Sequence, residues 1–297
     1  MILAAIDIGS NAARLLICET SMYKDGTVDY TKLSLLRIPL RLGFDVFDKG
    51  SISDTKKKEL IDTLNAYKLL MKIYKVEAYK ACATSALRDA SNGQKILEEI
   101  NRETKLNVSI ISGQEEANVI YETHIAENLS KDKSYLYIDV GGGSTEVTFF
   151  SQDNTLLKES FNIGTIRLLR DKVTDKTWDE MKRFIKTNIR VHQPVEAIGT
   201  GGNINKIFSI SKRKEGKPLT LDLLKDYYKE LSYSTIQERK HLYGFRDDRA
   251  DVIVPALQIY ISIMRWAYAE EIYVPKIGLA DGLIKILYKE VSQKKDG

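Results

Sequence analysis

Two stretches of this sequence share one order of residue types. LAAIDIGSNAARLLI begins at Leu3, and YLYIDVGGGSTEVTFF begins at Tyr135. Each is typical of an apolar strand that ends in an aspartate, a turn of glycine and small polar residues, and a second strand. Asp7 and Asp139 are equivalent and lie 132 positions apart (139 − 7). The shared order predicts a duplication into two similar sheet domains; the alternative is two unrelated hairpins with ordinary glycine turns.

The remaining patterns complete an α/β fold. The first half predicts the order βββαβαβα, with strands 3–8, 13–19, 28–38, 76–83 and 107–111, and helices from Ser53, over 93–104 and over 114–128. Three strands follow from Ser134, then helices 165–171 and 175–192, a strand VEAIGT, and a mostly helical remainder. Such an order builds mixed sheets with helices packed on them. We expect domains at 1–125 and 126–280, with the last helix, about 281–297, packing back on the first domain.

Composition narrows the class of protein. The 297 residues are 43% hydrophobic and 29% charged, which is typical of soluble globular domains. A formal charge of +4 suits an anionic ligand and is too small to indicate nucleic acid as a partner. Cys18 and Cys82 stand in apolar runs without metal-binding spacing, so we expect reduced core thiols and a cytoplasmic location. No apolar run approaches the ~20 residues that span a bilayer, and no membrane partner is expected.

The three glycines at 141–143 indicate an anion-binding turn. Glycine lets the backbone turn sharply and approach a ligand, and exposed N–H groups form a concave anion site. Carboxylates beside such a turn would repel a phosphate unless a cation lay between them. Mg²⁺ is typically held by one or two carboxylates together with water and phosphate. The candidate metal ligands, direct or through water, are Asp7, Asp139 and Glu146.

The stretch ISGQEEANVIYE offers a candidate base. Ser112 and Glu115 have the S-x-x-E spacing of a capping box, which would occupy the carboxylate of Glu115. Glu116 is then available in the first helical turn, where the helix dipole favours the ionised carboxylate. Such a carboxylate could accept a proton from water; the alternative is a surface glutamate beside a cap.

Two further stretches suit phosphate. Arg88 follows the strand 76–83, and an arginine near the carboxyl ends of strands is well placed for an anion, although most arginines are simply exposed. IGTGGNINKI is a strand, a glycine turn at Gly201 and Gly202, and a helix whose first amides could hold phosphate. It lacks the lysine of a Walker loop, and plain packing of a tight turn is an equal alternative.

Taken in order, these stretches resemble the exopolyphosphatase / guanosine pentaphosphate phosphohydrolase (Ppx/GppA) family, in a short two-domain form. The matching pieces are AAIDIGSNAARLLI, ACATSALRDA, ISGQEEANVIYE, YIDVGGGSTEV, NIGTIRLLR, AIGTGGNINKI, DDRADVIVPAL and GLADGLI. That family belongs to the superfamily of actin, sugar kinases and chaperone ATPases. The resemblance implies two actin-like domains with the active site in the cleft between them.

The resemblance also implies an activity, removal of terminal phosphate from inorganic polyphosphate or guanosine pentaphosphate with Mg²⁺ or Mn²⁺. It makes Glu116 the general base that activates water, and Asp139 and Glu146 the metal-linked acids. The phosphate-binding residues that it implies are Gly9, Ser10, Asn11, Arg88, Gly141, Gly142, Gly143, Ser144, Thr145, Gly201 and Gly202. Relatives are commonly dimers, so a homodimer is compatible with it.

Three departures leave the choice of substrate open. Ala12 replaces a serine of the first turn, Ala280 stands where an arginine is common, and the loop LGFDVFDKG differs from the usual glycine-rich stretch. Two other functions stay as alternatives: an ATP-binding kinase or ATPase of the same superfamily, and a non-catalytic sensor of alarmone or polyphosphate. A kinase would need an adenosine pocket, and a sensor would not need Glu116, Asp139 and Glu146 together.

Overall fold

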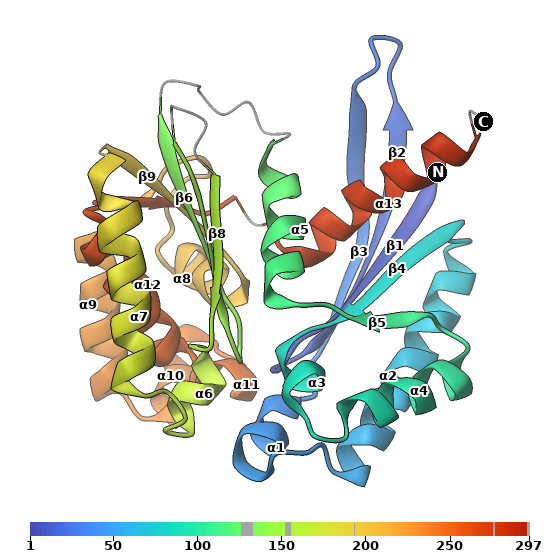
Figure 1. Ribbon diagram of the computed structural model, residues 1–297, viewed down its shortest axis with the longest axis horizontal. Helices are drawn as coiled ribbons and strands as arrows, with labels where there is room; N and C mark the ends of the chain where they lie inside the picture. Colours follow the sequence, from blue (N-terminus) through green and yellow to red (C-terminus); the bar gives the residue numbers. More distant parts are fainter. Residues whose placement is uncertain (126–132, 152–155, 193, 276, 296–297) are drawn as a thin grey trace. The chain divides into compact units, whose positions relative to one another are not determined.

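The computed structural model describes residues 1–125, 133–151, 156–192, 194–275 and 277–295. The chain divides into two compact units (Figure 1). Unit 1 is Met1–Ala126 together with Leu279–Gly297, and unit 2 is Glu127–Gly278. Each unit is a mixed sheet covered by helices, so the predicted α/β class is confirmed.

Unit 1 contains a five-stranded sheet in the order β3-β2-β1-β4-β5. The strands are β1 (Ile2–Ile8), β2 (Ala13–Met22), β3 (Val28–Ile38), β4 (Ala78–Ala83) and β5 (Val108–Ile110). β1 is antiparallel to β2 and parallel to β4. The helices are α1 (Leu42–Lys49), α2 (Asp54–Ile73), α3 (Ser85–Asp89), α4 (Gly93–Thr104), α5 (Gly113–Ile125) and α13 (Leu279–Lys295).

The C-terminal helix α13 is part of unit 1. It packs on β1, β2 and β4 and lies against α5 (Figure 1). Leu283, Ile284 and Leu287 recur at helical spacing and are buried with Leu3 and Leu16 of the sheet. Residues from the two ends of the chain therefore share one hydrophobic core.

Unit 2 contains a six-stranded sheet in the order β10-β11-β9-β6-β7-β8. Its strands are β6 (Ser134–Val140), β7 (Thr145–Phe150), β8 (Leu156–Phe161), β9 (Val195–Thr200), β10 (Leu219–Thr220) and β11 (Glu271–Tyr273). Its helices are α6 (Thr165–Leu169), α7 (Asp175–Asn188), α8 (Gly202–Ile210), α9 (Leu221–Tyr233), α10 (Ile236–Tyr243), α11 (Asp247–Ala250) and α12 (Ile253–Ala267), with a 3-10 turn at Arg190–His192. The apolar α12 supplies much of the core.

The topology confirms the internal duplication. The strand order β3-β2-β1-β4 in unit 1 corresponds to β8-β7-β6-β9 in unit 2. The hairpin turns also match: the N–H of Gly9 donates to the carbonyl of Ala12 at 3.0 Å, and the N–H of Gly141 donates to the carbonyl of Ser144 at 2.9 Å. Both residues of the second pair lie 132 positions after those of the first.

Some sequence-based elements were wrong. Residues 42–50, expected as a loop, form the helix α1 up to Lys49, because Leu42, Val46 and Phe47 are buried on one face of it. Gly50 ends the helix in the left-handed conformation. The short β10 was missed. The strand expected from residue 76 begins at Ala78, and the helix expected over 175–192 ends at Asn188. The predicted end of the helix 114–128 lies outside the described residues.

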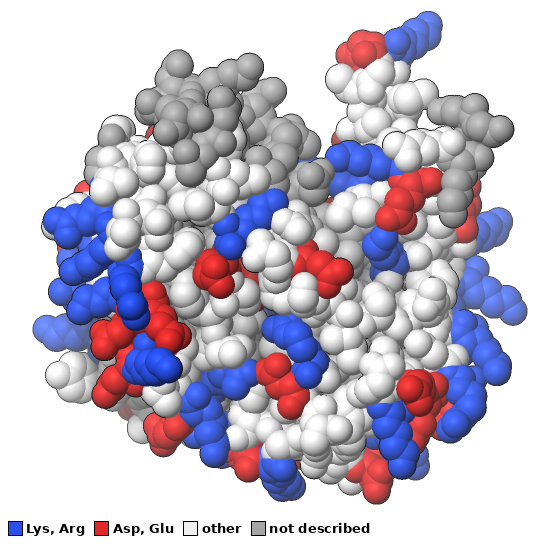
Figure 2. Space-filling view, in the orientation of Figure 1, with Lys and Arg blue, Asp and Glu red and all other residues white. Residues whose placement is uncertain are grey.

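The surface carries both signs of charge. Figure 2 shows acidic and basic side chains interspersed on the face it presents. Such mixing agrees with a formal charge of only +4. Among the helices within the described ranges, none combines the length and the apolar composition that crossing a bilayer requires.

Candidate active site

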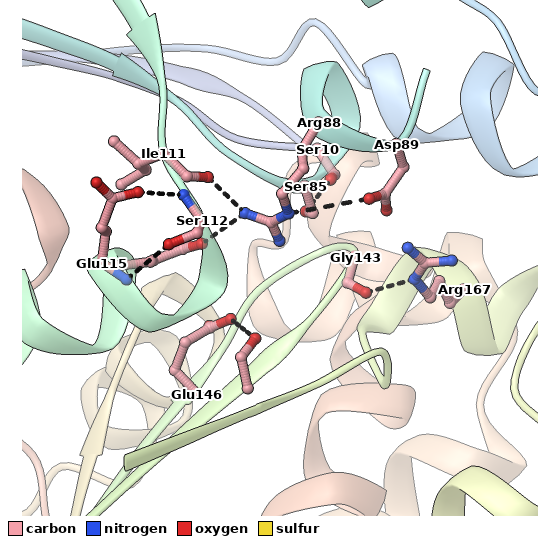
Figure 3. A network of polar contacts seen from close by, with 12 residues as sticks. Ser10, Ser85, Arg88, Asp89, Ile111, Ser112, Glu115, Gly143, Glu146 and Arg167 are labelled. Carbon is pink, nitrogen blue, oxygen red and sulfur yellow. Dashed lines mark hydrogen bonds and ion pairs between the residues drawn. The ribbon is translucent and has the colours of Figure 1, made fainter. Parts of the chain in front are cut away.

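The glycine turn of unit 2 is held from one side by α6. The carbonyls of Gly141 and Gly142 accept hydrogen bonds from the N–H of Thr165 at 3.0 Å and the N–H of Ile166 at 2.8 Å. The carbonyl of Gly143 accepts one from Nε of Arg167 at 2.5 Å (Figure 3). In a trans peptide the carbonyl and the following N–H point in opposite directions. The N–H groups that follow these carbonyls, up to that of Ser144, are therefore directed away from α6, as an anion-binding turn requires.

Gly164 allows α6 to approach this closely. A Cβ at Gly164 would lie 2.5 Å from backbone atoms of Gly142 and Gly143, which is closer than a real contact permits. A glycine at position 164 therefore lets α6 pack against the turn at 141–143. Arg167 of α6 is bonded to the same turn through the carbonyl of Gly143.

The turn of unit 1 is supported in the same way. The N–H of Gly43 donates to the carbonyl of Ser10 at 2.8 Å, and the N–H of Arg41 donates to the carbonyl of Asn11 at 3.0 Å. The start of α1 therefore holds this turn as α6 holds the other. By the same geometry, the N–H groups that follow the two carbonyls are directed away from α1.

Two acidic residues lie opposite each other in unit 2. Asp139 on β6 pairs in register with Glu146 on β7, and Glu146 is only 3% exposed. Burial raises the pKa of Tyr260 well above its usual value, and the charges of Asp139 and Glu146 add to the rise. Ser160 on β8 donates to Oε1 of Glu146 at 2.9 Å.

This pair fits a divalent cation. Like charges directly opposite on antiparallel strands repel, and a bound cation removes the repulsion. Within the described ranges no group of three or more His, Cys, Asp or Glu could hold a metal. Mg²⁺ does not require such a group, since one or two carboxylates with water and phosphate suffice. Asp139 and Glu146 would be its protein ligands, direct or through water.

Asp7 has different surroundings. Arg14 on β2 pairs with it in register, and Nη1 of Arg14 lies 2.5 Å from Oδ2 of Asp7. The carboxylate is buried and already has a cationic neighbour. Sequence reasoning overlooked Arg14, although aligning the two repeats places it at the position of Glu146.

The start of α5 separates the two neighbouring glutamates. The N–H of Ser112 donates to Oε2 of Glu115 at 2.7 Å, and the N–H of Glu115 donates to Oγ of Ser112 at 3.1 Å (Figure 3), which confirms the predicted capping box. The bonds from the backbone and side chain of Ser112 lower the pKa of Glu115. Glu115 is exposed, whereas Glu116 is 8% exposed.

Arg88 lies beside Glu116. Its Nη1 donates to the carbonyl of Ile111 at 2.9 Å, and its Nε is 3.9 Å from Oδ1 of Asp89 (Figure 3). Nη1 also lies 3.6 Å from Oε2 of Glu116. The guanidinium is thus held between α3 and the start of α5. Sequence reasoning selected both residues but did not foresee their contact.

A hydrogen bond joins α3 to the glycine turn of unit 1. The hydroxyls of Ser10 and Ser85 are 2.7 Å apart and buried. Burial raises the pKa of Cys82 well above its usual value, with further contributions from the charges of Asp7 and Glu116. Unit 1 therefore gathers Ser10, Asp7, Arg88 and Glu116 at one end of its sheet.

The third glycine turn lies beside Asp139. Gly201 has a φ of 98°, and a Cβ there would be 2.7 Å from Oδ1 of Asp139, so both conformation and space favour glycine. Arg249 donates to the carbonyl of Gly202 and to Oδ1 of Asn203. Arg249 belongs to the stretch DDRADVIVPAL, but its contact with this turn was not predicted.

Each unit thus brings together its own share of the predicted site residues. Unit 1 contributes the first turn, Arg88 and Glu116; unit 2 contributes the second and third turns with Asp139 and Glu146. The cleft that would join the two sets stays a prediction.

Comparisons with known proteins agree on one family. The model of the Ppx/GppA phosphatase family matches residues 23–290. Exopolyphosphatase 1 of Mycobacterium bovis is 24% identical, covering 100% of this chain and 90% of its own. A guanosine-5'-triphosphate,3'-diphosphate pyrophosphatase of Pseudoalteromonas translucida is 28% identical over 96% of this chain and 58% of its own. A bifunctional 3-dehydroquinate synthase/phosphatase of Fusobacterium nucleatum is 26% identical over 88% of this chain; the present chain spans only 43% of that protein.

Solved structures give the same result. The Ppx/GppA family member of Aquifex aeolicus has a TM-score of 0.75 and 27% identity, with 99% of this chain and 98% of that chain covered. An exopolyphosphatase of Cytophaga hutchinsonii has a TM-score of 0.83 and 25% identity, with 98% of each chain covered. The expected two-domain, actin-like α/β fold is confirmed by these neighbours, and the chain belongs to the Ppx/GppA phosphatase family.

Proposed function

We propose that this protein is a Mg²⁺-dependent phosphohydrolase that removes terminal phosphate from inorganic polyphosphate, guanosine pentaphosphate or both. The family membership supports the reaction class. The relatives named as exopolyphosphatase and as guanosine-5'-triphosphate,3'-diphosphate pyrophosphatase support these two substrate classes. Both substrates are polyanions with terminal phosphoanhydride bonds.

The observation that carries the proposal is the division of labour at the start of α5. Glu115 closes the helix cap through Ser112, whereas Glu116 is buried beside Arg88, 3.6 Å from its guanidinium. A carboxylate fixed in this way can accept a proton from a water molecule that attacks a phosphoryl group. Arg88 keeps the carboxylate oriented, and its remaining donors suit a phosphate oxygen.

The backbone turns would bind the substrate. N–H groups directed away from α1 and α6 suit phosphate oxygens, and they are fixed before any ligand arrives. Asp139 and Glu146 would hold Mg²⁺, which when bound neutralises charge on the phosphate oxygens. Mn²⁺ could replace Mg²⁺ there, because carboxylate ligands suit both ions.

The other expectations remain part of the proposal. We keep a cytoplasmic location, since Cys18 and Cys82 are buried free thiols. The expected partner is the phosphate substrate, without nucleic acid or membrane; a homodimer is compatible with the proposal.

Phosphate release from purified protein tests the proposal. Polyphosphate and guanosine pentaphosphate would be supplied separately, each with Mg²⁺ and with chelator, and ATP would serve as a third substrate. We expect release from at least one of the first two, and none in chelator. Turnover of ATP alone would favour the kinase or ATPase alternative, and tight binding without turnover would favour a sensor.

A further inference from the structure

The acidic pair of unit 2 belongs to a longer row across four neighbouring strands. In register, the row runs Thr200 on β9, Asp139 on β6, Glu146 on β7 and Ser160 on β8. Residues directly opposite on neighbouring strands project from the same face of a sheet. The two carboxylates are therefore flanked by a hydroxyl on each side. We call these four residues the hydroxyl–acid row.

Ser160 fixes one oxygen of Glu146. Its Oγ donates to Oε1 at 2.9 Å, and the carboxylate that receives this bond is almost fully buried. A bond to one oxygen of a carboxylate sets the rotation of the group about its terminal torsion, which is otherwise broad. It therefore also sets the direction of Oε2, the oxygen that Ser160 does not contact.

Thr200, at the other end of the row, has a hydroxyl group that suggests a bound ligand. Thr200 is fully buried, and its Oγ1 has no hydrogen-bond partner among the residues that the structure describes. A buried hydroxyl without a partner is rare in folded proteins and indicates an unseen water, ion or ligand. Here the hydroxyl belongs to the residue paired with Asp139.

The equivalent row of unit 1 has neither hydroxyl. It runs Cys82, Asp7, Arg14 and Arg37. There the acidic residue receives an arginine as its neighbour, and a second arginine takes the place that Ser160 has in unit 2. The hydroxyls therefore occur only in the row that contains two carboxylates, although both rows occupy the same position in their sheets.

We propose that Ser160 is a positioning residue for the divalent cation: it holds Glu146 so that Oε2 is presented, together with Asp139, to the ion. The inference rests on the proposed function in that the acidic pair must bind Mg²⁺ or Mn²⁺. Residues that orient metal ligands from behind typically change metal affinity 10- to 100-fold when they are removed.

Mn²⁺ binding to the full chain tests this role without relying on turnover. Free Mn²⁺ would be followed by electron paramagnetic resonance in the presence of inorganic phosphate. We expect Ser160→Ala to weaken Mn²⁺ binding about 10-fold, and Ser160→Thr, which keeps the hydroxyl, to restore most of the affinity. Ser134→Ala is the matched control, because Ser134 is buried on the same sheet at the other end of β6 and pairs with Val195.

The outcomes separate the two proposals. Unchanged Mn²⁺ affinity in Ser160→Ala, or equal loss in Ser134→Ala, overturns the positioning role even if the enzyme is active. No Mn²⁺ binding by the wild type overturns it as well. The wild type could bind Mn²⁺, lose affinity through Ser160→Ala, and yet release no phosphate from either substrate. That result would support the role of Ser160 and contradict the proposed function. Near-ultraviolet circular dichroism of each variant establishes that it is folded.

Discussion

Arg14 binds Asp7 through Nη1 and Oδ2 at 2.5 Å, and the residue equivalent to Arg14 in the second repeat is Glu146. The same position of the same hairpin therefore carries a cation in unit 1 and an anion in unit 2. A carboxylate beside arginine has an opposite charge next to it, whereas two carboxylates directly opposite each other repel. The duplicated scaffold has thus acquired two different electrostatic sites.

Substitution of the two equivalent aspartates tests this difference. We expect Asp139→Asn to raise the Mg²⁺ concentration for half-maximal phosphate release at least ~10-fold, because it removes one of two protein ligands. Asp7→Asn should leave that concentration within about threefold, a change too small to indicate a lost ligand.

Asp7→Asn should instead lower the free energy of unfolding by about 2 kcal/mol, because a partly buried arginine loses its charged acceptor. Urea unfolding measures this loss. Equal changes in metal requirement for the two variants would contradict the distinction between the sites.

The two neighbouring glutamates should separate clearly. We expect Glu116→Gln to lower turnover by ~10²-fold or more, the usual scale for loss of a general base, with little loss of stability. Glu115→Gln should retain most activity, because glutamine can still complete the capping box with Ser112. Turnover at saturating substrate and thermal unfolding of both variants would be compared. Abolished activity in Glu115→Gln alone would reverse the assignment.

The support of the glycine turn by α6 can be tested at Gly164. A methyl group there would lie 2.5 Å from backbone atoms of Gly142 and Gly143, so we expect Gly164→Ala to cost about 1–3 kcal/mol and to weaken substrate binding. Gly278→Ala is the control, since a Cβ at that position has nothing within 4 Å. Urea unfolding and KM would be measured for both; a Gly164→Ala protein as stable as the control would show that the turn yields easily.

The two thiols should be unreactive in the folded protein. Burial raises the pKa of Cys18 to about 11, and burial likewise raises that of Cys82 well above its usual value. Because the thiolate is the reactive form, only about 10⁻³ of Cys18 would be reactive at pH 8 even with full access. We expect a thiol reagent to label neither cysteine at pH 8 within minutes, and both after denaturation. Rapid labelling of native protein would show that a strand of unit 1 opens readily.

Local patterns sufficed for part of this structure. The spacing of Ser112 and Glu115 predicted their reciprocal hydrogen bonds, and the repeated Asp-apolar-Gly order predicted two equivalent hairpins. In both cases the determining residues are close in sequence. The periodicity of the apolar residues likewise located α2, α4 and α7 to within a few residues.

Contacts between distant segments were beyond such patterns. The ion pair of Arg88 with Glu116 joins the end of α3 to the start of α5, and the bond from Arg249 to Gly202 joins residues 47 positions apart. Helix α1 was missed because eight residues give little periodic signal and its stability comes from burying Leu42 and Phe47. That omission hid the support of the first turn, since the start of α1 supplies it.

The position of α13 has a consequence for biosynthesis. Leu283, Ile284 and Leu287 cover the sheet face that contains Leu3 and Leu16, yet the ribosome makes them only after the whole of unit 2. At ~5–20 residues per second, that sheet face waits about 10–60 s for its cover, whereas unit 2 is continuous and can complete its core first. We expect nascent chains released before residue 279 to show a protease-resistant unit 2 and a sensitive unit 1. Equal resistance of the two would mean that the sheet of unit 1 is stable without its last helix.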